Sequence, residues 1–471
     1  MSLATTASSQ YSPSALDDLR AQVRGPILLP GEPAWDEARS VWNAMIDRRP
    51  AFVLRCLGTP DIVAGVNFAR DHRLPVSVKG GGHNISGLAV CDGGVLLDMS
   101  LMRGVWVDRE RSIARAQPGC QLGDIDRETQ VHGLAAVMGF VSTTGIAGLT
   151  LGGGFGYLTS RFGWASDNLV AAEVVTADGR VVRASDDENA DLLWALRGGG
   201  GNFGVVTGFE YRLHPVGPEV VGGLVVWPAE DAPEVLELYR VLLREAPPEL
   251  ACGIVLRIAP AAPWLPSSIH GRPIVGILVC HTGSVPDGEQ LAAPVRSFGA
   301  PVADSVQRRS YLSQQSILDA TQPKGRRYYW KSEYLTGLES GLIEAMLRHA
   351  ARIASPHSAI LLFPLGEAVR HLPSDWSAAG NRDAALVLGI AAAWERPRDD
   401  APNIAWARAA WHDMRPFSTG GTYINFLTED EGADRIRAAY GGNYDRLVEV
   451  KTRWDPANLF RVNKNIAPHR S

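Results

Sequence analysis

The sequence predicts an α+β protein with two domains, and three observations lead to this prediction. The chain has 471 residues, which is more than one ordinary hydrophobic core accommodates. Between Phe52 and about Val216, helical and strand patterns are mixed, with hairpins in place of the strict βαβ alternation of a doubly wound sheet. From about Val220 to Thr419 the strands are longer and alternate with amphipathic helices, which indicates a second domain on a larger, antiparallel sheet.

Periodicity and turn residues predict the elements of the first domain. Apolar residues at helical spacing indicate helices, and short apolar runs bounded by glycine, aspartate or proline indicate strands. The turn sequence at residues 177–180, Ala-Asp-Gly-Arg, is typical of a hairpin. After an amphipathic segment at 15–23, the expected helices are 61–72, 121–133 and 188–201, and the expected strands are 74–80, 94–100, 104–110, 112–118, the hairpin 168–184, and 204–213.

The same patterns predict the elements of the second domain and the C-terminal region. A short strand is also expected around residues 422–426, where polar and apolar side chains alternate. The expected strands of the second domain are 222–228, 251–260, 272–283, 326–335 and 384–395, and the expected helices are 292–300, 341–354 and, near the C-terminus, 440–456.

Composition excludes several classes of function. The formal net charge is -5 at pH 7, which argues against nucleic acid as a partner. The sequence contains neither a signal-peptide pattern at its start nor an apolar run long enough to cross a bilayer, so we expect no membrane association and a cytoplasmic location. The five cysteines are scattered and form no CxxC pair, which predicts neither a disulfide framework nor a metal site. The oligomeric state is not readable from the sequence.

Three glycine clusters in the first domain are the strongest sequence signal. They lie at Gly80–Gly82 with Gly87, at Gly145–Gly156 and at Arg197–Gly204. Consecutive backbone N–H groups in such turns can form an anion-binding nest, and the missing side chains let a phosphate approach closely. Three such loops suit a long diphosphate ligand. The alternative interpretation is that these glycines only shape tight turns.

A Rossmann dinucleotide site is not supported by the third cluster. Gly199, Gly201 and Gly204 match the spacing GxGxxG, but that fingerprint has to follow a strand and open a helix. Here the helix comes before the glycines and the strand comes after them. The sequence also lacks the P-loop pattern GxxxxGK[ST].

His83 follows the first glycine cluster at the end of an expected strand. With no second histidine at metal-ligand spacing and no GxSxG elbow, neither zinc binding nor a serine triad is indicated. A neutral imidazole is a competent nucleophile and can bond to an electrophilic cofactor. The methyl carbon at position 8 of a flavin is such an electrophile. A satisfied core or surface histidine is the alternative interpretation.

Four motifs together resemble the berberine-bridge-enzyme-like group of FAD-linked oxidases, within the vanillyl-alcohol-oxidase type of flavoprotein. The motifs occur in the family's order and the resemblance extends over residues 52–468. It implies a two-lobed FAD-binding domain of the PCMH type and a substrate domain with a large antiparallel sheet covered by helices. The motifs are VKGGGHNISG, TTGIAGLTLGGGFGYLTSRFGWASDNLV, DLLWALRGGGGNFGVVT and YDRLVEVKTRWDPANLFRVNKNI.

The resemblance assigns the cofactor contacts residue by residue. His83 matches the histidine that is bonded to the 8α carbon of FAD, and the other matches lie in the glycine loops, the adenine-side strand and the C-terminal tail. The cofactor-binding residues expected beside His83 are Lys79, Gly80, Gly81, Gly82, Asn84, Thr144, Gly145, Gly148, Gly152, Tyr157, Asn168, Gly204, Val206, Asn463 and Asn465. The implied domains are residues 1–45 as an N-terminal segment, 46–217 for FAD, 218–425 for substrate, and 426–471 returning to the FAD domain.

Two departures from the family pattern concern the flavin itself. Many relatives form a second link from a cysteine to flavin C6, and Val141 stands at that position here. Cys120 lies about twenty residues earlier and is expected to be a packing residue, so we predict a single covalent link. Thr144 stands where relatives usually carry an aliphatic residue that gates oxygen access, which leaves the electron acceptor open.

A third departure concerns the catalytic base. Several relatives have YxNY near the C-terminus, and the last tyrosine removes a hydroxyl proton; this chain has Phe426 at that position. Strand alternation places Tyr423 and Asn425 on one face. Tyr329 and Lys331, which share a strand face with Glu333, are the other candidates for catalysis. A phenol near pKa ~10 needs a nearby cation to act as a base.

The resemblance implies an FAD-dependent oxidoreductase acting on a small molecule. It would oxidise a C–H bond next to a hydroxyl or amine by hydride transfer to flavin N5, with dioxygen as the acceptor and hydrogen peroxide as the product. Two alternatives stay open: a dehydrogenase with a different acceptor, and a flavin-binding protein without turnover, which Phe426 suggests. The sequence does not name the substrate.

Overall fold

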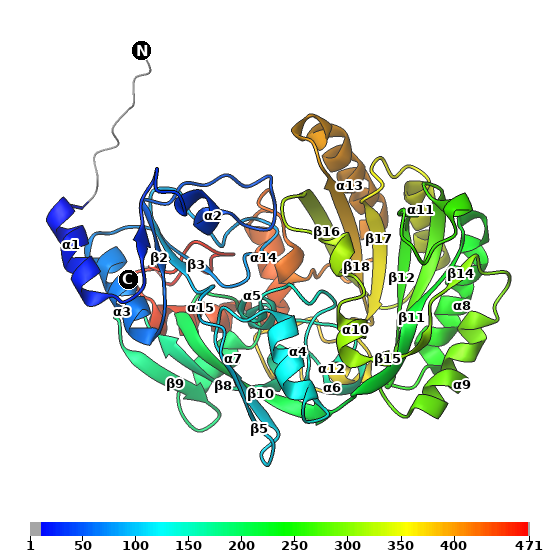
Figure 1. Ribbon diagram of the computed structural model, residues 1–471, viewed down its shortest axis with the longest axis horizontal. Coiled ribbons are helices and arrows are strands. Elements are labelled where there is room, and N and C mark those ends of the chain that lie inside the picture. The colour runs from blue at the N-terminus through cyan, green and yellow to red at the C-terminus, as the bar shows by residue number, and fades with distance from the viewer. Residues whose placement is uncertain (1–10, 470–471) are drawn as a thin grey trace.

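The computed structural model describes residues 11–469 and has the mixed helix and sheet architecture that the sequence predicts. Within this range the strands form three sheets, two smaller ones in the first half of the chain and a large one in the second half. Figure 1 shows the two halves side by side, with the large sheet and its helices on the right. The first ten residues of the expected N-terminal segment lie outside the described residues.

The first sheet is built around a parallel core. Its order is β1-β2-β4-β3, with β2 and β3 both parallel to β4 and β1 antiparallel to β2. The central strands are apolar and buried, as strands covered on both faces are. The strands are β1 (Ile27–Leu28), β2 (Phe52–Arg55), β3 (Val76–Lys79) and β4 (Val95–Asp98).

The second sheet is antiparallel and contains the hairpin expected at 168–184. The long strand β10 (Val205–Pro215) pairs with three neighbours, β6, β7 and β8. By pairing with these three strands, β10 joins the strands of the second sheet. The remaining strands are β5 (Val105–Asp108), β6 (Ile113–Ala116), β7 (Leu134–Ala136), β8 (Leu169–Val175) and β9 (Val181–Ser185).

The third sheet has eight antiparallel strands, which confirms the expected large antiparallel sheet. Its order is β14-β11-β13-β12-β17-β18-β16, with β15 pairing with β11. The central strand β17 was not expected. The strands are β11 (Glu219–Pro228), β12 (Leu250–Ile258), β13 (Pro273–His281), β14 (Ala303–Asp304), β15 (Gln307–Ser310), β16 (Arg327–Leu335), β17 (Ala359–Pro364) and β18 (Leu386–Trp394).

Helices cover the outer face of the large sheet, and its inner face is turned toward the first half (Figure 1). The sheet-covering helices are α8 (Ala232–Glu245), α9 (Val285–Arg296), α11 (Ser340–Ala350) and α13 (Asp400–Met414). The others are α1 (Pro13–Gln22), α2 (Trp35–Arg39), α3 (Thr59–Asp71), α4 (Leu122–Gln130), α5 (Ile146–Leu151), α6 (Thr159–Phe162), α7 (Ala190–Leu196), α10 (Tyr311–Gln315), α12 (Glu367–Arg370), α14 (Ala433–Tyr440) and α15 (Tyr444–Trp454).

Two expected elements differ from the structure. The helix expected at 292–300 begins earlier, at Val285, and ends at Arg296. The strand expected at 422–426 is instead a short 3-10 helix, η7 (Ile424–Phe426). No strand of the described chain pairs with η7, so alternation does not apply to it. The hydroxyl of Thr422 donates to the carbonyl of Ser332 in β16, Asn425 donates to the carbonyl of Leu149 in α5, and the N–H of Gly154 donates to the phenol oxygen of Tyr423.

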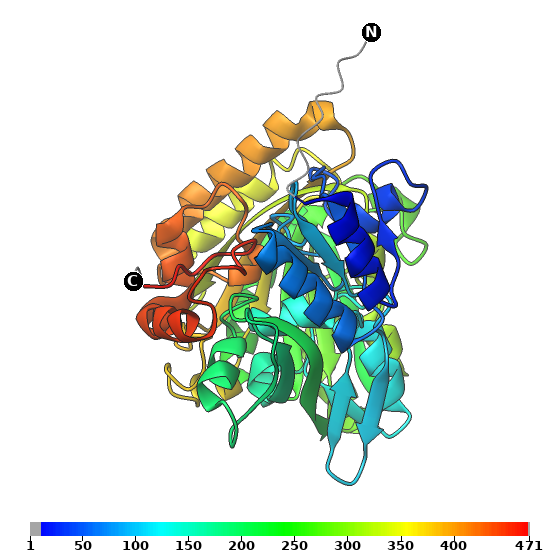
Figure 2. The same ribbon diagram turned by 90° about the vertical axis from the view of Figure 1, so that its left-hand side faces the viewer.

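The C-terminal segment returns to the first half of the chain. Helix α15 packs against α7, and Figure 2 shows the red C-terminal helices at the left edge of the molecule. The buried Lys451 fastens this segment, because its ammonium group donates to the carbonyls of Asn202 and Phe460 and pairs with Asp455. Over residues 11–469, no helix has the length and apolar character needed to span a membrane.

Candidate active site

A cavity of about 370 Å³ lies between the first half of the chain and the inner face of the large sheet. Its wall combines the loop at residues 80–85, helix α5, the glycines at 200–204 and residues 460–464 of the C-terminal segment. The large sheet contributes side chains from β12, β16, β17 and β18. Residues far apart in the sequence therefore meet around one space.

The loop at residues 80–85 presents unpaired backbone donors to this cavity. Among the described residues, none of its N–H groups donates to another protein group. Gly82 has a φ of +69°, which favours glycine. A Cβ on Gly81 would lie 2.5 Å from Cα of Gly145, so the first two glycine clusters touch backbone to backbone. Successive free N–H groups of this kind form a nest for an anion.

Two glycines in the wall leave open space where a side chain would project. A Cβ built on Gly148 or on Gly201 meets no atom within 4 Å, although both residues line the cavity. Gly152 is different, because a Cβ there would collide with the amide of Asn425. The wall is therefore shaped for a large ligand at Gly148 and Gly201 and for a protein contact at Gly152.

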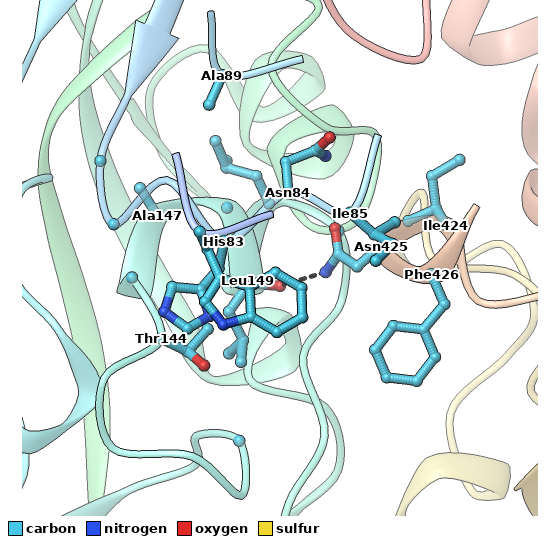
Figure 3. Close-up of a pocket in the computed structure, with 18 of the residues that line it drawn as sticks. His83, Asn84, Ile85, Ala89, Thr144, Ala147, Leu149, Ile424, Asn425 and Phe426 are labelled. Carbon is cyan, nitrogen blue, oxygen red and sulfur yellow. Dashed lines mark hydrogen bonds between the residues drawn. The ribbon is translucent and has the colours of Figure 1, made fainter. Parts of the chain in front are cut away.

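His83 lies within the nest at residues 80–85, next to Thr144 (Figure 3). The indole of Trp42 stacks on its ring, with centroids 5.3 Å apart and planes 16° apart. Burial is the main reason that the pKa of His83 falls to about 4, and the charge of Lys324 lowers it further. The imidazole is therefore neutral at pH 7, which is the nucleophilic form.

A short connector at residues 42–44 joins the nest to the large sheet. The N–H of Trp42 donates to the carbonyl of Gly82 at 3.0 Å, and the N–H of Ala44 donates to Arg326 at 2.9 Å. The amide of Asn43 donates to the carbonyls of Ile85 and Tyr328, at 2.9 and 3.0 Å. The nest is thus held against β16.

Tyr423 and Asn425 face the cavity and contact each other. The phenol oxygen of Tyr423 accepts hydrogen bonds from the N–H of Gly154, at 3.1 Å, and from Nδ2 of Asn425, at 2.9 Å. Asn425 also donates to the carbonyl of Leu149, the bond drawn in Figure 3. Burial outweighs these two donors and raises the pKa of Tyr423 to about 12. Phe426 lines the same wall, with its ring centroid 4.9 Å from that of Tyr423.

Comparison with known proteins identifies the family to which this chain belongs. The FAD binding domain family matches residues 50–185, and the berberine and berberine-like family matches residues 422–467. Over 465 residues the chain is 32% identical to (R)-6-hydroxynicotine oxidase of Paenarthrobacter nicotinovorans, an alignment that covers 95% of this chain and 98% of the relative. The chain belongs to the berberine-bridge-enzyme-like FAD-linked oxidoreductases.

Two further likenesses agree with this assignment. An FAD-linked oxidoreductase of Dictyostelium discoideum is 31% identical over 431 residues, covering 91% of each chain. The crystal structure of 6-hydroxy-D-nicotine oxidase from Arthrobacter nicotinovorans superimposes with a TM-score of 0.84 at 29% identity, covering 95% of this chain and 98% of that one. The expected fold and the expected class of enzyme, an FAD-linked oxidoreductase, are confirmed.

The cavity of the oxidoreductase fits FAD. The nest at residues 80–85 offers free donors to a diphosphate, and the open space over Gly148 and Gly201 leaves room for an extended ligand. Asn463 lines the cavity with a buried amide oxygen that has no partner among the described residues. These features support the prediction that the glycine clusters hold the cofactor.

Most residues predicted to contact FAD do line the cavity. They come from all the segments that the sequence motifs indicated, and the structure brings them together around one space. They are Gly80, Gly81, Gly82, His83, Asn84, Thr144, Gly145, Gly148, Gly152, Gly204, Val206 and Asn463.

Four predicted cofactor residues are not part of the cavity wall. The ammonium group of Lys79 donates to the carbonyl of Ala38 and lies 3.4 Å from the carboxylate of Asp98. Asn168 donates to two carbonyls of its own turn and contacts His214. Tyr157 packs against residues of β13, and Asn465 lies outside the wall. The side chains of Lys79 and Asn168 are held by protein groups, and the FAD contacts of all four residues stay predictions.

Tyr329 and Lys331, the other candidates for catalysis, do not line the cavity. Both share a face of β16 with Glu333, as expected, but this face packs under the helices. Tyr329 donates to Asp430 at 2.7 Å, and the ammonium group of Lys331 lies 3.1 Å from Glu431. The opposite face of β16, with Trp330, lines the cavity.

The position of Tyr329 outside the cavity gives a first testable expectation. Tyr329→Phe removes the hydroxyl that Arg408 and Asp430 contact and should lower the free energy of unfolding by about 1 kcal/mol. The anaerobic rate of flavin reduction should change by less than about threefold, because the side chain does not reach the cavity. Tyr423→Phe, which removes a cavity hydroxyl, is the matched variant and should lower that rate by about tenfold or more. A large loss of rate in the Tyr329 variant would contradict the assignment.

No cysteine lines the cavity in the described part of the oxidoreductase. Val141 occupies the wall at the position that the family comparison singled out. Cys120 is buried, its thiol is directed at the carbonyl of Gly104, and burial raises the pKa of that thiol to about 12. Residues 11–469 also contain no cluster of side chains suited to a metal ion.

Sequence reasoning missed most of the cavity wall on the side of the large sheet, which we call the substrate side. The missed residues include Trp42, Arg257, Trp330 and His357, all in or next to expected strands or loops. Only the pairing of distant strands brings them together, so no local motif could have identified them. The buried Asn202, which bonds to Gly199, Lys464 and Ile466, was detectable as part of the glycine-rich motif.

Proposed function

We propose that this oxidoreductase holds FAD through a single covalent bond from His83 and oxidises a C–H bond next to a hydroxyl or amine of a small molecule. Bound FAD supplies a two-electron acceptor at N5. Dioxygen would then take the electrons and form hydrogen peroxide. The observation that carries this proposal is the position of the His83 imidazole in the cavity wall, within the loop of free N–H groups at residues 80–85; its lowered pKa favours the neutral, nucleophilic form.

The reaction that would form the covalent bond is balanced when dioxygen is the oxidant. A ring nitrogen of His83 would replace one hydrogen of the 8α methyl group and lose its own proton. Dioxygen would take up the two electrons and two protons that are released and become hydrogen peroxide. The low pKa of His83 keeps the ring nitrogen free to react at neutral pH.

A single link is supported by the side chains around the cavity. A second bond to the flavin would need a cysteine thiolate in the wall, and Val141 occupies the position in question. Cys120 is buried away from the cavity and stays protonated at neutral pH. His83 is then the sole attachment point.

The proton that accompanies the hydride needs an acceptor when the substrate is an alcohol. Tyr423 keeps its proton at neutral pH, since its pKa is raised to about 12, and so it acts as a hydrogen-bond donor. The described wall contains no carboxylate. His357 lines the cavity with a lowered pKa, caused mainly by burial, and can accept a proton. An amine that binds in its neutral form needs no base.

The proposal is tested by mixing the purified yellow protein with panels of alcohols and amines under anaerobic conditions. A substrate should bleach the flavin absorbance, and air should restore it with release of one peroxide per reduced flavin. If no compound bleaches the flavin, a binding protein without turnover, which Phe426 suggests, replaces the proposal.

Thr144 favours a second candidate function, that of a dehydrogenase that passes its electrons to an acceptor other than dioxygen. It lines the cavity beside His83, where a polar side chain stands in place of the aliphatic residue of relatives. The expected result is peroxide formation at the rate of substrate oxidation. Rapid turnover with a quinone or dye, together with negligible peroxide in air, would favour the dehydrogenase.

A further inference from the structure

The inner face of the large sheet carries a row of four side chains across four strands, and its two central members are alanines. These two alanines form the alanine floor of the cavity. Trp330, Ala391, Ala359 and Arg257 pair in register from β16 through β18 and β17 to β12. All four line the cavity. Neighbouring strands are about 4.8 Å apart, so roughly 14 Å separates the backbones at the two ends of this row. An indole stands at one end, a guanidinium at the other, and two methyl groups lie between them.

Arg257 is a cation without a carboxylate partner. Its Nε and Nη2 donate to the carbonyls of Ile258 and Pro356, both at 3.2 Å, and no acidic side chain of the described chain lies within ion-pair distance. Burial, and next the charge of Arg326, lower the pKa of Arg257 to about 10. It remains charged at neutral pH. A half-buried charge of this kind is unfavourable unless an anion accompanies it.

The groups around Arg257 reinforce its positive potential. Arg326 also lowers the pKa of His357, which stands next to Arg257 in the wall. The carboxylate of Glu395 lies 3.3 Å from His357, and its side chain is 68% exposed. The corner of the cavity beyond the alanine floor therefore attracts an anion, and nothing in the described wall neutralises it.

Several further side chains of the wall on the side of the large sheet are apolar or aromatic. Phe363 and Leu361 continue the floor along β17, and Phe426 packs edge to face on Trp330 at 4.8 Å. Aromatic walls of this kind bind flat rings better than they bind polyhydroxylated sugars, whose hydroxyls need partners. The alanines leave the space that such a ring would occupy.

We propose that the substrate is a flat, apolar molecule that carries an anionic group, of which a carboxylate is the simplest, and that Arg257 binds this group across the alanine floor. This inference rests on the proposed function of the same cavity. It makes Arg257 a specificity-determining residue for the reaction.

The first experiment measures binding of benzoate to the holoenzyme by its effect on the flavin absorbance spectrum. Benzoate should perturb the spectrum of the wild type, Arg257→Gln should raise its Kd by about tenfold or more, and Arg257→Lys should restore part of the affinity. Arg308→Gln, which changes an arginine paired with Glu219 at the surface, is the matched control and should leave Kd unchanged. Equal binding to the wild type and the Arg257→Gln variant, or no spectral change in the wild type, would overturn the inference.

The second experiment compares flavin reduction by acids and by their neutral esters. The probes are 4-(hydroxymethyl)benzoate and 4-(aminomethyl)benzoate, each with its methyl ester. The wild type should be reduced faster by at least one acid than by its ester, by about tenfold or more, and Arg257→Gln should abolish this preference. If the esters react as fast as the acids, the inference fails while the proposed function stands. A colourless protein, or one whose flavin no alcohol or amine reduces, rejects the proposed function itself.

Discussion

Replacement of His83 by alanine is expected to release all of the flavin when the protein is precipitated with acid. In the wild type the yellow pigment should stay with the precipitate, because the proposed bond to the imidazole would hold it covalently. The variant keeps the glycine nest, whose backbone donors do not depend on the side chain, so it should still bind FAD reversibly in its folded form. The absorbance of pellet and supernatant measures the outcome.

The control for this result is His371→Ala, in which an exposed histidine far from the cavity is removed. It should behave as the wild type does, with all pigment in the pellet. Retention of covalent flavin by the His83 variant would show that another side chain forms the bond and would remove the chemical basis of the proposed mechanism. Fluorescence of a denaturing gel gives a second, independent readout.

Gly148→Leu is expected to abolish FAD binding without weakening the fold. The new side chain would project into the open space of the cavity, where no protein atom lies within 4 Å. Gly148 lies inside helix α5, and leucine forms helices better than glycine does, so the free energy of unfolding should rise by about 0.5–1 kcal/mol. The measurements are flavin content after reconstitution and a urea unfolding curve of the flavin-free protein.

Gly442→Leu is the matched control, because Gly442 is also free of neighbours within 4 Å but lies outside the cavity wall. Its flavin content should equal that of the wild type. Full flavin occupancy in the Gly148 variant would show that the cofactor does not lie over α5. Reduced stability of that variant would instead show that the open space is filled by protein.

Many elements were predictable from local patterns, although β17 and α8 were not, and the identity of the cavity-facing side chains was not predictable either. A period of two shows that Tyr329 and Lys331 share a face of β16, yet it does not show which face lies inside. In the structure the inner face carries Trp330, whose neighbours Ala391 and Ala359 come from other strands. Register across four strands is long-range information that no single segment contains.

The cofactor motifs were more informative, because backbone shape depends on local glycines. The loop at 80–85 and the open space at Gly148 follow from residues that lack side chains. Lys79 shows the limit of this reasoning. Its place beside the nest suggested a phosphate contact, but pairing of β3 with β4 sets Asp98 directly opposite and draws the ammonium group to the protein.

The connector at residues 42–44 has a consequence for how the molecule is made. Asn43 bonds both to Ile85 and to Tyr328, which a ribosome synthesises 285 residues after Asn43. The nest at residues 80–85 leaves the ribosome early. The bonds by which the connector joins it to β16 can form only after β16 has emerged. We therefore expect flavin capture to be a late event in biogenesis, and fragments that end before β16 should be colourless when they are released.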